Sequence, residues 1–131
     1  MKIVLVTTLG KEIIPSGIVS AVLTQTAEVA CDSLSIKIIG GKSLDEIERV
    51  YAYKNNKLIF NGYCDCQRTI ADERGFETYI YARSSACLLV DNDAFAYTYN
   101  RPSAQSLFDA YAKPFGFSYK LDDICTFKKY E

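Results

Sequence analysis

The clearest alternation of hydrophobic and polar positions runs through residues 32–39. Leu34, Ile36 and Ile38 are aliphatic, and polar residues such as Ser35 stand between them. Successive side chains of a β-strand point to opposite faces of the sheet, so this period of two predicts a strand. One face of that strand is expected in a hydrophobic core and the other in water.

A later region predicts three further strands joined by polar turns. The expected strands are Val50–Tyr53, Leu58–Cys66 and Phe76–Ala82, and the turns between them are Lys54–Lys57 and Ala71–Gly75. Asn and Gly accept the positive φ angles that such turns require. Two hairpins in succession predict a β-meander.

Two strands are expected earlier in the chain and one helix near its end. Lys2–Thr8 and Ile18–Thr26 are rich in Val, Ile and Leu, which favours strands. The helix is expected at about 103–113, because apolar residues recur there with helical spacing. These residues are Ala104, Leu107, Phe108, Tyr111 and Ala112. Ser103 is the expected N-cap, and Pro114 is expected to end the helix.

These elements together predict a mainly β fold with one helix. The fold class is a small β-barrel or rolled sandwich, with the α-helix at about 103–113 flanking it. The length of 131 residues fits one domain of ordinary size. We expect a β domain over residues 1–118. Residues 119–131 have no clear period, and we interpret them as a C-terminal tail, the start of a following segment of a longer protein.

Gly62 is a special position within the middle strand of the meander. Glycine inside a strand indicates a bulge, a close approach of another backbone, or a bend where the sheet curls. We favour a bend of the sheet at Gly62.

The charge balance argues against nucleic acid or a membrane as the partner. Fifteen basic and sixteen acidic side chains give a net charge of −1, whereas nucleic-acid-binding proteins carry a basic surface. No apolar run approaches the about 20 residues that span a bilayer as a helix.

Five cysteines and the absence of histidine limit the chemistry further. The cysteines are expected as reduced thiols, and Cys64 and Cys66, on one strand face, as small core residues. Without histidine or a second cysteine pair, no metal site and no cofactor are predicted. Ser–His and Cys–His catalysis are excluded for the same reason. Carboxylates such as Asp65 lie in no catalytic motif, so the chain is not predicted to be an enzyme.

The order of several short motifs resembles a known family. The motifs are Leu34–Ile38, Val50–Tyr63, Tyr81–Asp91, Pro102–Leu107 and Ala112–Phe117. In this order they resemble the N-terminal part of phage baseplate hub proteins, of the late-control-D and phage-Mu-hub type. Hub proteins are much longer than this chain, which is consistent with a truncated or minimal relative.

The resemblance implies a tail-tube-like fold and a structural role without catalysis. Such domains assemble into a trimer or hexamer-like ring that connects the tail tube to the spike or tip. The expected partners are therefore copies of the chain and other tail or baseplate proteins. The expected location is the virion tail, assembled in the cytoplasm of a host bacterium. A small β-barrel that binds a saccharide or single-stranded nucleic acid is the alternative.

Four residues are candidates for special roles. Tyr79 and Tyr81 share the polar face of one strand, and we expect them to form an interaction surface, because tyrosine suits partly wet contacts. Ordinary strand tyrosines on a solvated face are the alternative. Arg83 and Asp91 bound the segment after that strand. We expect Arg83 to fork onto a carboxylate or onto backbone carbonyls, which would fix a structural corner.

Overall fold

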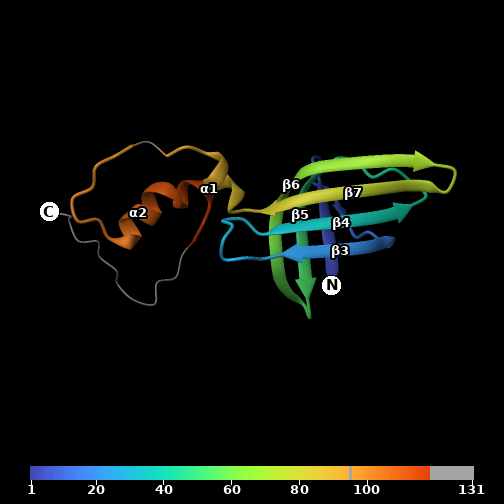
Figure 1. Ribbon diagram of the computed structural model, residues 1–131, viewed down its shortest axis with the longest axis horizontal. Helices are drawn as coiled ribbons and strands as arrows, with labels where there is room; N and C mark the ends of the chain where they lie inside the picture. The colour runs from blue at the N-terminus through green and yellow to red at the C-terminus, as the bar shows by residue number, and fades with distance from the viewer. Residues whose placement is uncertain (95, 119–131) are drawn as a thin grey trace. The chain divides into compact units, whose positions relative to one another are not determined.

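The computed structural model describes residues 1–94 and 96–118. The chain divides into two compact units, Met1–Cys87 and Leu88–Glu131 (Figure 1). The first unit is a β-sheet, and the second contains the helix α2, so each is described by itself.

The first unit is one antiparallel sheet of seven strands in the order β2-β1-β5-β6-β7-β4-β3. The strands are β1 (Lys2–Thr7), β2 (Glu12–Ile13), β3 (Ile18–Thr24), β4 (Ser33–Gly40), β5 (Ile47–Lys54), β6 (Lys57–Asp72) and β7 (Gly75–Ser84). The predicted mainly β fold with one main helix is confirmed. The sheet is open, because β2 and β3 are edge strands, so it is a rolled sheet and not a closed barrel.

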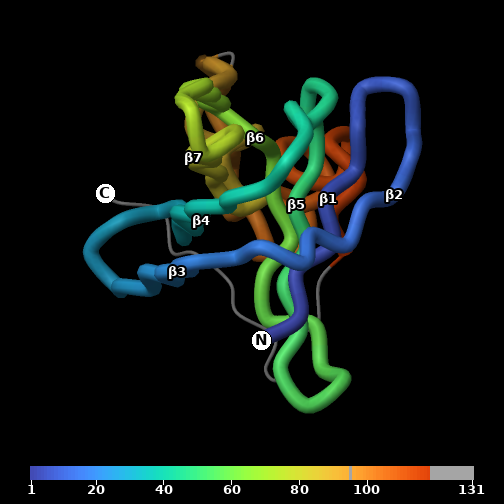
Figure 2. The backbone as a smooth tube through the Cα atoms, turned by 90° about the vertical axis from the view of Figure 1, so that its right-hand side faces the viewer, coloured from blue at the N-terminus to red at the C-terminus, as the bar shows by residue number. Residues whose placement is uncertain are grey.

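Strand β6 joins the two halves of this roll. Its first part pairs with β5, and from Gly62 onward it pairs with β7. At 16 residues it is longer than the sequence predicts, since it continues to Asp72. In Figure 2, β1 and β5 run roughly from top to bottom, whereas β3 and β4 run roughly from side to side. The sheet therefore folds over itself, and the face inside the fold becomes the core.

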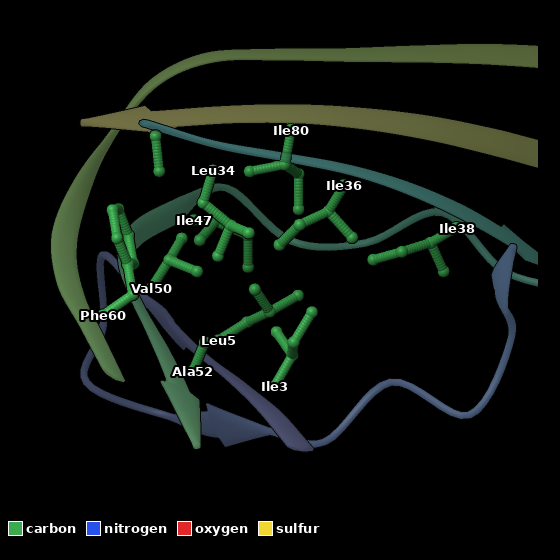
Figure 3. Close-up of a cluster of buried hydrophobic side chains, with 11 residues drawn as sticks. Ile3, Leu5, Leu34, Ile36, Ile38, Ile47, Val50, Ala52, Phe60 and Ile80 are labelled. Atoms are coloured by element: carbon green, nitrogen blue, oxygen red, sulfur yellow. The ribbon is translucent and has the colours of Figure 1, made fainter. Parts of the chain in front are cut away.

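The core is built from the alternating aliphatic residues. Leu34, Ile36 and Ile38 of β4 are all buried, as the period of two predicts. Figure 3 shows Ile3 and Leu5 of β1 pointing toward these side chains from the other half of the roll. The remaining members come from β5, β6 and β7 and are Ile47, Val50, Ala52, Phe60, Ile80 and Ala82.

Asparagine and glycine occupy positions where the backbone needs a positive φ angle or room for a neighbouring strand. Asn55 and Asn56 have φ angles of 51° and 59°, which makes the tight turn between β5 and β6. Gly62 lies where β6 passes from one neighbour to the other. A Cβ atom there would stand 2.2 Å from the carbonyl oxygen of Arg83. The structure shows the close backbone approach at Gly62, and the favoured bend of the sheet there stays a prediction.

The short helix α1 (Cys87–Asp91) begins at the last residue of the first unit, and the second unit also contains the helix α2 (Ala104–Tyr111) and the 3-10 turn η1 (Lys113–Phe115). Ser103 is the N-cap of α2, and its side chain accepts a hydrogen bond from the backbone N–H of Ser106. Helix and N-cap thus agree with the sequence analysis. The predicted boundary between residues 118 and 119 adjoins the part of the chain outside the described residues, and it stays a prediction.

Candidate interaction surface

The outer face of β7 carries three of the four candidate residues. Thr78, Ile80 and Ala82 are buried on the inner face, so Tyr79, Tyr81 and Arg83 point outward. Tyr81 is 42% exposed, and Tyr79 is half-buried. The structure brings these three side chains together on one face.

Tyr79 lies at the centre of a cluster of charged side chains. In the sheet register, Lys37 of β4 and Arg68 of β6 are its lateral neighbours. The Lys37 ammonium lies 5.3 Å from the centre of the Tyr79 ring, and the Arg68 guanidinium carbon lies 5.6 Å from it. Both cations are within cation–π range. The faces of the ring are therefore engaged by its own neighbours.

Glu77 completes this cluster. Its carboxylate accepts a hydrogen bond from the Tyr79 hydroxyl and lies 3.0 Å from the Lys37 ammonium. The hydrogen bonds from Tyr79 and then Lys37 lower the pKa of Glu77. The hydrogen bond to Glu77 is the main cause that raises the pKa of Lys37. Both side chains are still about one-third exposed at the surface, so the pair orders the surface more than it stabilises the fold.

A shallow hollow lies beside Tyr81. It measures about 240 Å³ and is lined by residues of β3, β4, β6 and β7, among them Val22, Ser35 and Cys66. Val22 is 58% exposed at the rim of the sheet. The hollow is large enough for one side chain of a partner and too small for a multi-residue ligand.

The position of Cys66 in this hollow corrects the sequence analysis. Cys64 pairs with Ala82 and Cys66 with Tyr81, so Asp65 is an extra residue, a β-bulge. The bulge turns Cys66 to the outer face, where it is exposed, while Cys64 packs against the core. The prediction that both are core residues on one face is wrong for Cys66. Burial raises the pKa of the Cys64 thiol.

The bulge also aims Asp65 at Arg83. The Arg83 Nε donates to one carboxylate oxygen of Asp65, and Nη2 lies 3.3 Å from the other. This is the fork onto a carboxylate that the sequence analysis expects, with Asp65 as a partner. Asp91 belongs to the second unit, and its role beside Arg83 stays a prediction, as does the role of the corner as a whole.

The sequence analysis missed a second cluster, around Arg49 of β5. Its guanidinium lies 4.4 Å from the ring centre of Tyr63 and 5.5 Å from that of Tyr51. It donates to Asn61 Oδ1 at 2.6 Å and to the Tyr63 hydroxyl at 3.1 Å. The signal was present in the sequence, since Arg49 and Tyr51 are two residues apart on one strand face and Asn61 and Tyr63 repeat that spacing on the next strand.

The second unit has its own hollow of about 670 Å³. It is lined mainly by apolar residues of α2, by Leu89 of α1 and by the chain after α1, and the α2 residues include Leu107 and Phe108. The Tyr99 hydroxyl donates to the Tyr111 hydroxyl at 3.1 Å in the same unit. The apolar stripe of α2 thus faces a hollow.

Two negative findings apply to residues 1–94 and 96–118. No three side chains of the His, Cys, Asp or Glu type gather closely enough to hold a metal ion. No helix in these ranges combines the length and apolar character needed to cross a bilayer.

The fold is similar to that of a solved prophage protein. The sequence matches no protein-family model and no curated protein. Among solved structures, it is similar to the 43 kDa tail protein of prophage MuSo2 from Shewanella oneidensis, with a TM-score of 0.66 and 19% identity. The similarity covers 88% of this chain and 38% of that protein. This chain therefore has a fold found in a prophage tail protein, and it spans well under half of that protein's length.

Proposed function

We propose that this chain is a structural protein of a phage or prophage tail. The observation that carries the proposal is the shared fold with the prophage tail protein over 88% of this chain. The more specific form is a component of the baseplate hub that connects the tail tube to the tip. The order of sequence motifs supports this form, independently of the fold. The protein is located in the virion tail after assembly in the host cytoplasm, and it works without catalysis.

The open sheet supports assembly into a ring. Within the described residues, the outer edges of β2 and β3 have no strand partner, and neither has one edge of the C-terminal half of β6. Two different edges on one chain allow head-to-tail contacts between copies. Such contacts close into a ring when the rotation from one subunit to the next fits. Unpaired strand edges also template the addition of further strands. A trimer or hexamer-like ring with copies, or with other tail proteins, uses these edges.

Immunogold electron microscopy of tails tests this proposal. An antibody against the full chain is applied to particles released from the source bacterium after prophage induction. We expect gold at the tail end away from the head, and none on particles from a strain in which the gene is deleted. Labelling confined to soluble protein, with normal tails in the deletion strain, would refute the tail role.

A saccharide or single-stranded nucleic acid ligand is the second candidate. Such ligands stack on exposed aromatic faces. The Tyr79 ring has Lys37 and Arg68 over it, which leaves mainly Tyr81 for stacking. Tyr81 is the one exposed tyrosine on the described sheet, and Tyr97 is exposed in the second unit, so neither unit offers a row of stacking faces and this candidate is favoured less than the tail role. Binding of oligothymidylate, or of a glycan on an array, that is lost in Tyr81→Ala would favour the ligand-binding role over the tail role.

A further inference from the structure

The C-terminal end of β6 has a short free edge. Residues 68–72 pair with β7 on one side, and within residues 1–94 and 96–118 no strand pairs with the other side. Figure 1 shows this part of β6 at the rim of the sheet. Just before this edge, the Gln67 side chain bonds to the backbone of Asp45 and Ile47, and just after it the chain turns at residues 73–74. The free edge therefore has two definite ends.

Two residues of this edge direct their backbone groups outward. The two-residue turn at 73–74 pairs Asp72 with Gly75, and the residues that flank such a turn exchange backbone hydrogen bonds. Hydrogen-bonded and non-hydrogen-bonded pairs alternate along an antiparallel ladder. The even-numbered residues of this stretch therefore bond to β7, and the N–H and C=O groups of Thr69 and Ala71 point to the free edge.

The side chains of this edge are arranged symmetrically about Ile70. Arg68, Ile70 and Asp72 lie on the outer face, because every second residue of a strand shares a face, and all three are exposed. The cation lies two residues before Ile70 and the carboxylate two residues after it. A two-fold axis at Ile70 would therefore bring the cation of one copy opposite the carboxylate of another.

We propose that a second copy of this chain pairs with this edge in antiparallel orientation, about a two-fold axis at Ile70. Thr69 of each copy then lies opposite Ala71 of the other, and these two pairs exchange four backbone hydrogen bonds. Arg68 of each copy lies opposite Asp72 of the other, and the two Ile70 side chains meet at the axis. These three pairs are of the non-hydrogen-bonded type, in which opposite Cα atoms are only about 4.5 Å apart and side chains approach closely.

The ends of the free edge fit this register and disfavour its neighbours. The outward backbone groups of two copies meet only in registers that differ by an even number of residues. A shift of two residues one way would bring the second strand beside Cys66, where residues 44–47 already line the same side of β6. The opposite shift would place Arg68 opposite Arg74 of the other copy, which is unfavourable for like charges. In the proposed register each strand ends opposite Arg68 and turns away toward β7.

The two charged groups keep bonding capacity for a second copy. Arg68 also acts on Glu77 of its own copy, but it is the weakest cause that lowers the pKa of that carboxyl, after the hydrogen bonds from Tyr79 and Lys37. A guanidinium has five N–H donors. Asp72 accepts one hydrogen bond, from the backbone N–H of Arg74 at 2.8 Å, and a carboxylate has about four acceptor sites.

This contact goes beyond the proposed function and does not rest on it. Both copies use the same surface, so the contact joins two copies and does not by itself build a ring. The outer edges of β2 and β3 stay open for head-to-tail contacts.

Sedimentation equilibrium and amide hydrogen exchange of the full chain test the inference. We expect a dimer that dissociates on dilution. The amides of Thr69 and Ala71 should become protected as the protein concentration rises. The amide of Ile70, which already bonds to β7, should change less.

Charge exchange tests the register. Arg68→Asp and Asp72→Arg each place like charges opposite one another at both ends of the contact. Each variant alone should raise the dissociation constant of the dimer about tenfold, as for the loss of two exposed ion pairs. An equimolar mixture of the two variants restores opposite charges at both ends, and its heterodimer should bind about as tightly as the unchanged chain. Lys57→Asp makes the same change of charge at the other end of β6 and should leave the dissociation constant unchanged.

Three results would overturn the inference. One is a monomer at millimolar concentration. Another is a dimer in which the amides of Thr69 and Ala71 gain no protection. The third is a mixture of the two charge variants that associates no more tightly than either variant alone. Because none of these measurements involves tail particles, such a result leaves the immunogold test of the proposed function unaffected.

Discussion

Replacing Gly62 with alanine tests the architecture of the roll most directly. The added Cβ atom would lie 2.2 Å from the Arg83 carbonyl oxygen and 2.7 Å from the Phe60 ring. Carbon–oxygen contacts in sheets are about 3.3–3.6 Å, so the backbones must separate by about 1 Å. Neither neighbour yields easily, because one is a backbone carbonyl of β7 and Phe60 is only 3% exposed.

The expected loss of stability follows from these contacts. Overpacking a core typically costs about 1–3 kcal/mol, and a weakened ladder hydrogen bond adds about 1 kcal/mol. The lower entropy of alanine in the unfolded chain offsets about 0.4–1 kcal/mol. The net loss in the free energy of unfolding is therefore about 1–3.5 kcal/mol.

Urea unfolding at 25 °C, followed by circular dichroism, measures this loss. Gly41→Ala is the matched control, because a Cβ atom there meets nothing within 4 Å. We expect the control to change stability by less than about 1 kcal/mol. If Gly62→Ala unfolds at the same urea concentration as Gly41→Ala, the close approach of β6 to β7 is not tight, and the reasoning fails.

Three other predictions follow from the packing and the charges. Leu34→Ala should lower the free energy of unfolding by about 2–5 kcal/mol, because Leu34 is fully buried, whereas Val22→Ala on the surface should change it little in the same urea assay. Ser103→Ala should cost α2 about 1 kcal/mol through loss of its N-cap, seen as faster amide exchange at Ser106. Because the pKa of Glu77 is lowered, its stabilising contribution is present above the unfolded value of about 4.3 and is lost as pH falls through its folded pKa. NMR titration of Glu77 should therefore give a pKa that rises toward the ordinary value in Tyr79→Phe, and no rise would contradict this origin.

The sequence predicted the parts of the fold that depend on residues close together in the chain. The alternation around Leu34 gave a strand with the correct buried face, and the pair Asn55–Asn56 formed the expected turn. Ser103 capped the helix as its position suggested. Each of these features depends on a few neighbouring residues, so it is visible in the sequence.

The parts that depend on pairing between strands could not be predicted. The bulge at Asp65 follows from the register of β6 against β7, and no local signal distinguishes Asp65 from its neighbours. Because the bulge was unforeseen, Cys66 was assigned to the wrong face. The same limit explains why Arg68, which flanks Tyr79 only through that register, was not among the predicted site residues.

Strand β6 separates the stability of this protein from its capacity to bind. Its first part, around Phe60 and Gly62, forms the wall of the core and tolerates little change. Beyond the bulge at Asp65, Arg68–Asp72 are exposed and contribute little to the core. Substitutions such as Arg68→Glu should therefore leave the free energy of unfolding nearly unchanged. Because the core does not constrain this part of β6, its side chains can change without loss of the fold.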